Sequence, residues 1–241
     1  MTRKPNIGRA AISGAVLLLA SFHASAAMET YDFYKLTSTN TENLGSQLTI
    51  TVWDSVMANS EFSLSLESTD IFFTVQNDVD NGFAGNVAEV YFDDGLFGPS
   101  VAFNSLGGFT SFTGGGATPS ELPAGNTASP PFVASQEFSA DVDSGSPSKG
   151  VDASADILGI KLGLGSFADF ADVNDAILSG DLRFGLHVRS IGAAGLSDSY
   201  INNPEGLQPP NEVPLPAAAW LFGTGLLGLA GISRRKKAQA S

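Results

Sequence analysis

The chain has 241 residues, 43% of them apolar, and it contains no cysteine, which excludes disulfides, thiolate metal sites and cysteine nucleophiles. Its formal net charge is −13 at pH 7, and between Glu29 and Glu212 five basic residues stand against all 25 acidic ones, a balance of −20. A surface this acidic repels phosphate backbones, so we expect no nucleic acid among the partners.

Residues 1–27 have the three parts of a secretory signal peptide. Three basic residues precede position 10, and an apolar run follows to about residue 22. Ala24, Ser25 and Ala26 then form a small-residue cleavage site, with Ala24 and Ala26 as its small positions. The pattern predicts export through a translocase and a mature start near Ala27.

Residues 28–201 are predicted to form one acidic domain made of short strands. Apolar and polar residues alternate with a period of two, and Gly, Asn and Asp turns separate the runs. The regular runs are 48–53, 62–67, 71–75, 87–93, 158–164 and 182–189, and 31–36 and 137–142 are less regular.

Two segments of this domain depart from the strand pattern. Residues 104–131 are rich in Gly, Ser, Thr and Pro, which predicts a surface loop or an inserted flap. Phe170, Val173 and Ile177 fall on one face of a helix, so we expect one short helix over 169–178. The predicted fold is a mainly β, antiparallel β-sandwich with one short helix, and a jelly roll is one arrangement that fits. Residues 202–212 are a predicted spacer.

Catalytic patterns are sparse in this domain. His23 belongs to the signal peptide, so a Ser-His-Asp triad would depend on His187, which we expect on the polar face of a strand. Asp93 and Asp94 offer paired carboxylates for an exported glycosidase, but they also read as a hairpin turn. Trp53, beside Asp54, offers a ring for sugar stacking or a core side chain. We therefore expect a protein that is not an enzyme.

One acidic loop is a candidate calcium site. Asn77, Asp78, Asp80 and Asn81 place four oxygen-bearing side chains before the turn residue Gly82, and calcium prefers six to eight oxygen ligands. The spacing differs from that of an EF-hand, and an Asx-rich turn explains the same residues. Calcium is the only cofactor that the sequence suggests, and otherwise we expect none.

The C-terminus combines a proline motif, an apolar run and a basic cluster. Val213, Pro214, Leu215, Pro216 and Ala217 lead into an apolar segment, which predicts a transmembrane helix over 215–232. The cluster that follows is expected on the cytoplasmic side of the membrane, so the acidic domain faces away from the cytoplasm. Its residues are Arg234, Arg235, Lys236 and Lys237.

Residues 213–237 resemble the VPLPA-type variant of the PEP-CTERM sorting signals of Gram-negative bacteria, because the motif, the glycine-rich apolar helix and the basic cluster occur in order. The resemblance implies an inner-membrane-anchored precursor that an exosortase-type membrane transpeptidase cleaves. The mature protein would then reach the cell surface or the extracellular polysaccharide matrix. A non-enzymatic surface or matrix protein is the expected function, with a carbohydrate- or calcium-binding module as the alternative.

Overall fold

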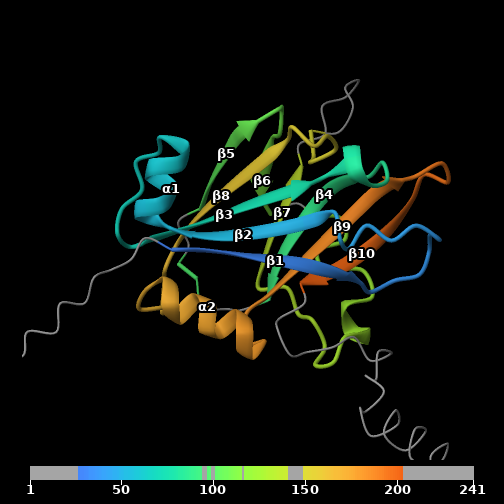
Figure 1. Cartoon of the computed structure of the whole chain (residues 1–241). Helices are drawn as coiled ribbons and strands as arrows, with labels where there is room; N and C mark the ends of the chain where they lie inside the picture. Colours follow the sequence, from blue (N-terminus) through green and yellow to red (C-terminus); the bar gives the residue numbers. More distant parts are fainter. Residues whose placement is uncertain (1–26, 94–96, 99–100, 116, 141–148, 203–241) are drawn as a thin grey trace, which may run out of the picture.

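The computed structural model describes residues 27–93, 97–98, 101–115, 117–140 and 149–202. This part of the chain is mainly β, with ten antiparallel strands and two α-helices (Figure 1). In chain order the elements are β1 (Met28–Lys35), β2 (Leu48–Asp54), α1 (Ser55–Phe62), β3 (Asp70–Asn77), η1 (Val79–Asn81), β4 (Asn86–Asp93), β5 (Val101–Gly107), β6 (Phe112–Gly114), η2 (Gly125–Thr127), β7 (Gln136–Ala140), β8 (Ile157–Gly163), α2 (Phe170–Ser179), β9 (Arg183–Ile191) and β10 (Leu196–Asn202).

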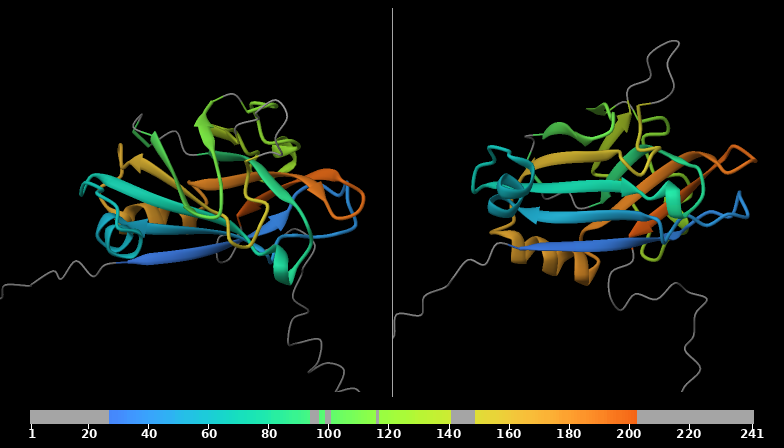
Figure 2. Two further views of the ribbon diagram at one scale, coloured as in Figure 1. Left: turned by 90° about the horizontal axis from the view of Figure 1, so that it is seen from above. Right: turned by 45° about the horizontal axis from the view of Figure 1, so that its top comes forward.

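All ten strands belong to one sheet, in the order β5-β8-β3-β2-β1-β10-β9-β4-β7-β6. β1 joins its two halves, since Met28–Asp32 pair with β2 whereas Phe33–Lys35 pair with β10. The halves face each other across the interior (Figure 2). On the side away from β1, the two ends of the sheet approach each other: the rings of Phe103 on β5 and Phe138 on β7 meet edge to face, with 5.3 Å between their centroids. The sheet is therefore nearly closed.

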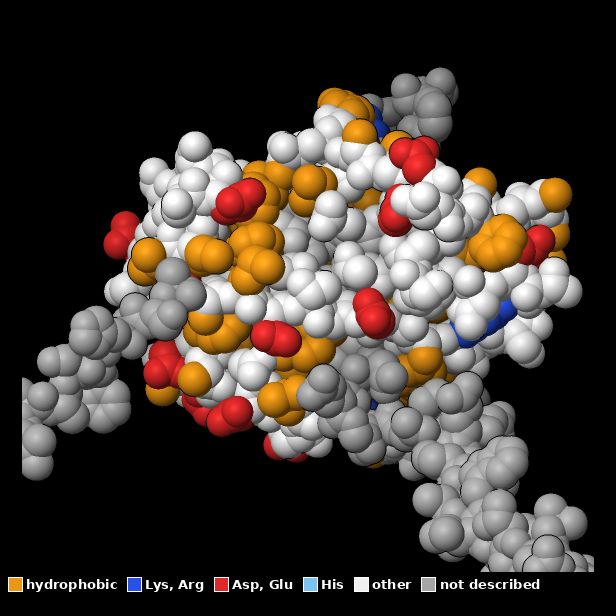
Figure 3. Space-filling model, viewed as in Figure 1, with side chains coloured by type: hydrophobic (Ala, Val, Ile, Leu, Met, Phe, Trp, Pro, Cys, Tyr) orange, Lys and Arg blue, Asp and Glu red, His pale blue; other side chains and the backbone are white. Residues whose placement is uncertain are grey.

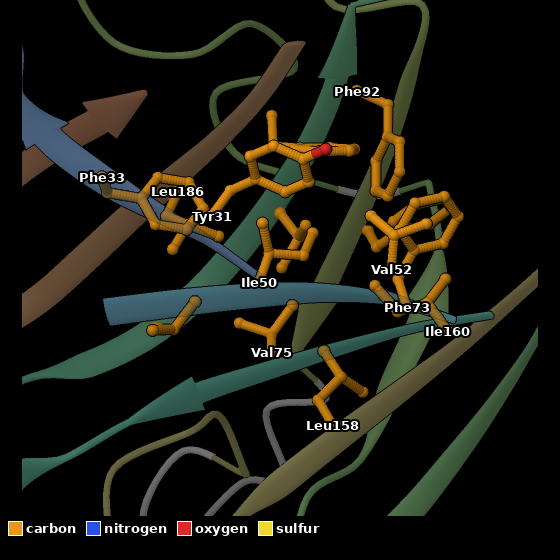
Figure 4. Close-up of a cluster of buried hydrophobic side chains, with 14 of the residues drawn as sticks. Tyr31, Phe33, Ile50, Val52, Phe73, Val75, Phe92, Leu158, Ile160 and Leu186 are labelled. Carbon is orange, nitrogen blue, oxygen red and sulfur yellow. The ribbon is translucent and has the colours of Figure 1, made fainter. Parts of the chain in front are cut away.

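A single apolar core fills the space between the two halves. Phe73 of β3 makes edge-to-face contacts with Phe92 of β4 at 5.2 Å and with Phe184 of β9 at 5.6 Å. Figure 4 shows Ile50 and other side chains of the first half pointing toward Leu186 and Phe92 of the second. Edge-to-face rings add attraction to the burial of their area, so these phenylalanines tie the halves together.

The alternation correctly predicts most of the strands. Those expected at 48–53, 71–75, 87–93, 158–164 and 182–189 correspond to β2, β3, β4, β8 and β9, and those at 31–36 and 137–142 to β1 and β7. β10 extends through Asn202, the residue that the sequence assigns to the start of the spacer. The rest of the spacer lies outside the described residues.

The prediction of a strand at 62–67 is wrong. Phe62 ends helix α1, and residues 63–67 form no strand. The alternation of apolar and polar residues corresponds to alternating burial instead: Phe62, Leu64 and Leu66 are half-buried, and the residues between them are exposed. The Phe62 ring packs on Trp53 at 5.1 Å and on Phe72 at 5.9 Å, so the segment lies along the sheet without pairing with a strand.

Two helices are present where the sequence predicts one. α2 matches the predicted helix: Asp169 accepts a hydrogen bond from the Asp172 N–H at its start, and Val173 and Ile177 are buried. α1 was not predicted. Asp54 caps it by accepting from the Met57 N–H at 2.6 Å, but its apolar residues do not share one face.

The Gly- and Pro-rich segment is more ordered than a surface loop. It contributes the end of β5, all of β6 and η2. Residues 117–134, the cover segment, pack on the outer face of β4, β9 and β10, where Leu122 and Phe132 form a small second core with Tyr91 and Ile201. Gly185 makes this contact possible, since a Cβ there would lie 2.9 Å from a methyl carbon of Leu122.

Among the described residues, none belongs to a helix with the length and apolar character needed to cross a membrane. The span expected at 215–232 lies outside them.

Candidate functional site

A hollow of about 510 Å³ opens where β1 begins, between α1, α2 and the neighbouring ends of β2 and β3. Its wall carries the carboxylates of Asp54, Asp70, Asp169 and Asp175, and no basic side chain lines it among the described residues. We call it the acidic hollow. Such a concavity concentrates negative potential and favours a cation.

Three of the four acidic groups in this hollow have a local structural reason for their position. Asp54 and Asp169 are the N-cap residues of α1 and α2, so each carboxylate satisfies a free N–H of a helix start. Asp70 accepts a hydrogen bond from the Glu67 N–H and lies 3.6 Å from the Lys161 ammonium. Two helix starts therefore bring two of these carboxylates to the hollow.

Asp54 makes one further contact at the rim. Its Oδ2 accepts a hydrogen bond of 2.7 Å from the backbone nitrogen of Ala27, the residue expected to begin the mature chain. Its own N–H donates to the Ala27 carbonyl at 3.0 Å, which continues the β1–β2 ladder by one step. The sequence draws attention to Asp54 only as the neighbour of Trp53, and no local pattern links it to Ala27.

Trp53 does not present a free ring for sugar stacking. Its indole N–H donates to Thr74 Oγ1 at 2.9 Å, and its ring packs edge to face on Phe62. The side chain fastens α1 to the sheet.

A polar cluster lies beneath the cover segment. Glu89 of β4 is only 3% exposed, lies in hydrogen-bond contact with His187 Nδ1 at 2.8 Å and forms an ion pair with Arg189 on β9. Arg189 also donates to the Thr118 carbonyl of the cover segment. The expectation that His187 lies on an exposed polar face is wrong, because the cover segment buries that face. The alternation of β9 therefore separates two buried faces rather than a buried and an exposed one.

Tyr91, which lies beside this cluster, is also buried. Burial raises the pKa of Tyr91 well above its ordinary value, and the nearby carboxylates of Glu89 and Glu137 raise the pKa further. The hydroxyl therefore stays protonated and donates to the Pro119 carbonyl at 2.8 Å. It anchors the cover segment.

Asp93, the candidate glycosidase carboxylate, also holds the cover segment in place. It forms an ion pair with Arg183 and accepts a hydrogen bond from the Val133 N–H at 3.1 Å. Arg183 donates to the carbonyls of Pro130 and Pro131, both at 2.6 Å. Asp94, its expected partner in catalysis, lies outside the described residues.

The four candidate calcium ligands do not share one environment: Asn77 is buried, whereas Asp78, Asp80 and Asn81 are exposed. Asn77 is fully buried: its Oδ1 accepts from Gln47 at 2.7 Å, and its Nδ2 donates to the carbonyls of Gly85 and Val151. Asp78 and Asn81 lie together on the exposed loop, joined by a hydrogen bond of 2.8 Å.

A residue outside the predicted set completes this loop. Ser154 Oγ lies 3.1 Å from Asp78 Oδ1 and accepts from the Asp80 N–H at 2.9 Å. Ser154 could not be found from the local spacing, because it comes from the start of the β8 segment. Within the described ranges no group of three or more His, Cys, Asp or Glu side chains has a metal-binding arrangement.

The remaining sequence candidates lie outside the described residues. They are the cleavage-site residues Ala24 and Ala26, the motif residues 213–217 and the basic cluster 234–237.

Comparison with protein-family models, with curated proteins and with solved structures finds no match for this chain.

Proposed function

We propose that this chain is an exported, non-enzymatic protein of the cell surface or the extracellular matrix, delivered by its C-terminal sorting signal. The observation that carries the proposal is the agreement between the limits of the sheet and the sorting patterns. β1 starts at Met28, two residues after the small residue Ala26, and β10 ends at Asn202, before the motif that begins at Val213.

The uses made of the acidic and basic side chains support a structural role. In the described parts of the chain, Glu89, Asp93, Arg183 and His187 hold the cover segment or lie beneath it, and Asp54 caps a helix. An enzyme would need such groups to meet a substrate.

The surface charge supports a location in a hydrated extracellular matrix. Figure 3 shows acidic side chains spread over the visible face and few basic ones. With a balance of −20 between Glu29 and Glu212, the domain repels other copies of itself and remains dispersed.

Two finer assignments belong to this proposal. The facing halves of the sheet act as the layers of an antiparallel β-sandwich, which the contacts of Phe73 with Phe92 and Phe184 support. Residues 215–232 act as a membrane anchor in the precursor, which their apolar composition and the basic cluster behind them support.

The experiment is expression of the full chain in a Gram-negative host with and without an exosortase-type transpeptidase. With the enzyme present, we expect surface-exposed protein that starts at Ala27 and has lost the basic cluster 234–237. Without it, an inner-membrane precursor should accumulate. Cell fractionation and intact mass measure both outcomes.

A pair of double variants makes this test specific. Replacing Pro214 and Pro216 by alanine should leave the precursor in the membrane even when the enzyme is present. The matched control replaces Pro209 and Pro210, two prolines that precede the motif, and should be processed normally. Equal processing of both variants would remove the assigned role of the motif.

Calcium binding at the exposed loop is a second candidate function, favoured by the oxygen atoms of Asp78 and Ser154 that meet there beside the Asn81 side chain, whose Nδ2 donates to Asp78. A cation that binds only the folded chain raises the melting temperature as its concentration increases. A shift removed by a chelator and by Asp78→Ala would favour the binding module over the purely structural role.

A further inference from the structure

The backbone nitrogen of Ala27 lies 2.7 Å from the Asp54 carboxylate, on the wall of the acidic hollow. From this contact we infer that Asp54 and the hollow form a docking site for the chain's own amino terminus after the leader is removed. The inference rests on the proposed export and on cleavage between Ala26 and Ala27.

The chemistry of that cleavage changes the group that Asp54 meets. Hydrolysis of the peptide bond by a leader peptidase adds water: the hydroxyl joins the carbonyl carbon of Ala26, and a proton joins the nitrogen of Ala27. The resulting α-amine has an ordinary pKa of about 8, so it takes up another proton at neutral pH. A neutral amide N–H becomes an ammonium group with three donors.

The position of Ala27 does not have to change for this group to be bound. The Asp54 N–H holds the Ala27 carbonyl at 3.0 Å, and the ladder continues from Met28, opposite Trp53. The carboxylate of Asp54 occupies the place where a strand partner would accept the next hydrogen bond, because α1 begins at Ser55. An ammonium at this nitrogen forms a charge-assisted hydrogen bond, which is stronger than the neutral one.

The surrounding charges favour the same group. Asp70, Asp169 and Asp175 line the hollow together with Ala27, and the nearby cation is Lys161, which lies 3.6 Å from Asp70. Part of the Asp70 charge is therefore neutralised, whereas Asp54 meets no basic side chain among the described residues. An ammonium at Ala27 supplies the missing positive charge.

Docking of the new terminus links leader removal to the stability of the fold. In the precursor the Ala27 nitrogen is an uncharged amide, so it brings no positive charge to Asp54. In the mature chain the ammonium closes the β1 end against α1. The processed domain is therefore more stable than its precursor.

The test uses the chain from Ala27 to Ser241 in detergent, with the leader replaced by a removable tag whose protease leaves Ala27 as the first residue. Tag removal should raise the melting temperature by about 3 °C, the shift that a single moderate interaction gives in a domain of this size. Asp54→Asn should abolish this rise, since asparagine still caps α1 but carries no charge.

Asp169→Asn is the matched control. It removes a charge from the other helix cap in the same hollow, and it should keep the rise because Asp169 does not contact Ala27. A chain that begins at Ala26 moves the ammonium by one residue and should lose the rise with every side chain intact, which keeps the test valid if Asp54→Asn folds poorly.

The pH dependence supplies a second readout. The pair raises the pKa of the folded amine, so its stabilisation is fully present below about pH 8 and is lost as the pH rises through the folded value. An unchanged melting temperature after tag removal, or an equal rise in Asp54→Asn, would overturn the docking site. Export with a mature start other than Ala27 would instead contradict the leader assignment.

Discussion

The Lys35 ammonium at the end of β1 lies 2.9 Å from a carboxylate oxygen of Asp198 on β10. Asp198 is also an acceptor for Thr37 Oγ1, for the Thr39 N–H and for the backbone and side-chain nitrogens of Asn40. Its side chain is fully buried, at 0% exposure. One carboxylate therefore organises the turn after β1 and fastens it to the last strand.

Asp198→Asn should lower the free energy of unfolding by about 3 kcal/mol, because removing one member of a buried pair leaves the other charge uncompensated. Chemical denaturation of the chain from Ala27 to Ser241 measures this loss. Asp32→Asn is the control, since Asp32 lies exposed on β1, and it should change stability by less than about 0.5 kcal/mol. Equal effects would show that Asp198 has no special role.

The same carboxylate predicts a dependence on pH. Burial alone would raise the pKa of Asp198, but the hydrogen bonds from Thr37, Lys35, Asn40 and Thr39 outweigh it and hold the pKa well below the ordinary 3.8. A depressed folded pKa stabilises the fold above the ordinary value and loses this contribution as the pH falls toward the folded value. The stability difference between the native chain and Asp198→Asn should therefore shrink between about pH 5 and about pH 2.

Asn77→Ala should cost about 2 kcal/mol, because Gln47 Nε2 and the carbonyls of Gly85 and Val151 lose a buried partner. The loss should be the same with calcium and with chelator, since the Asn77 amide is used inside the fold. Asn81→Ala, on the exposed part of the loop, is the control with little expected effect on stability. Thermal unfolding with calcium and with chelator measures the loss of stability. A loss seen only in the calcium sample would show that Asn77 is a calcium ligand.

Gly185→Val should loosen the cover segment while leaving the sheet folded. The new side chain would occupy the space of Leu122 and Phe132, whose carbons lie 2.9 and 3.1 Å from the position of a Cβ. Limited proteolysis should then cut within 117–134 at least about tenfold faster. This rate corresponds to a decrease of about 1.4 kcal/mol in the free energy needed to open the cover segment locally. Gly195→Val is the control, since a Cβ there meets no atom within 4 Å, although its φ of +66° predicts local strain.

Much of the sheet could be predicted because many of its strands direct their large apolar side chains to the face that packs in the main core, and a period of two marks such a face even where the other face is also buried. The misses have local causes. β6 and the end of β5 lie in a segment whose glycines and threonines favour loops, and β10 carries the polar residues Asp198 and Ser199 at buried positions. The segment 62–67 has the opposite property: it alternates like a strand but forms none, because its apolar side packs on the sheet at Trp53 and Phe72.

The candidate site depended on contacts that no local pattern contains. Ala27 and Asp54 are 27 residues apart, and Asp78 meets Ser154 across 76 residues. Residue type suggested that Asp78 could bind a cation, but only the path of the chain brings Ser154 to it. His187 was placed on the wrong kind of surface for the same reason, because the segment that covers it comes from a distant part of the sequence.

The place of β1 in the sheet has a consequence for the timing of folding. Its second half pairs with β10, the last strand, through partners such as Phe33 and Asn202. If the chain crosses a translocase from its amino end, as the proposed function requires, β1 has only one strand neighbour until residue 202 has emerged. Pairing across so long a separation is slow, and here it delays closure of the sheet until the whole domain is outside. Under the proposed export, this order of strands would keep the chain in a transportable state for as long as transport lasts.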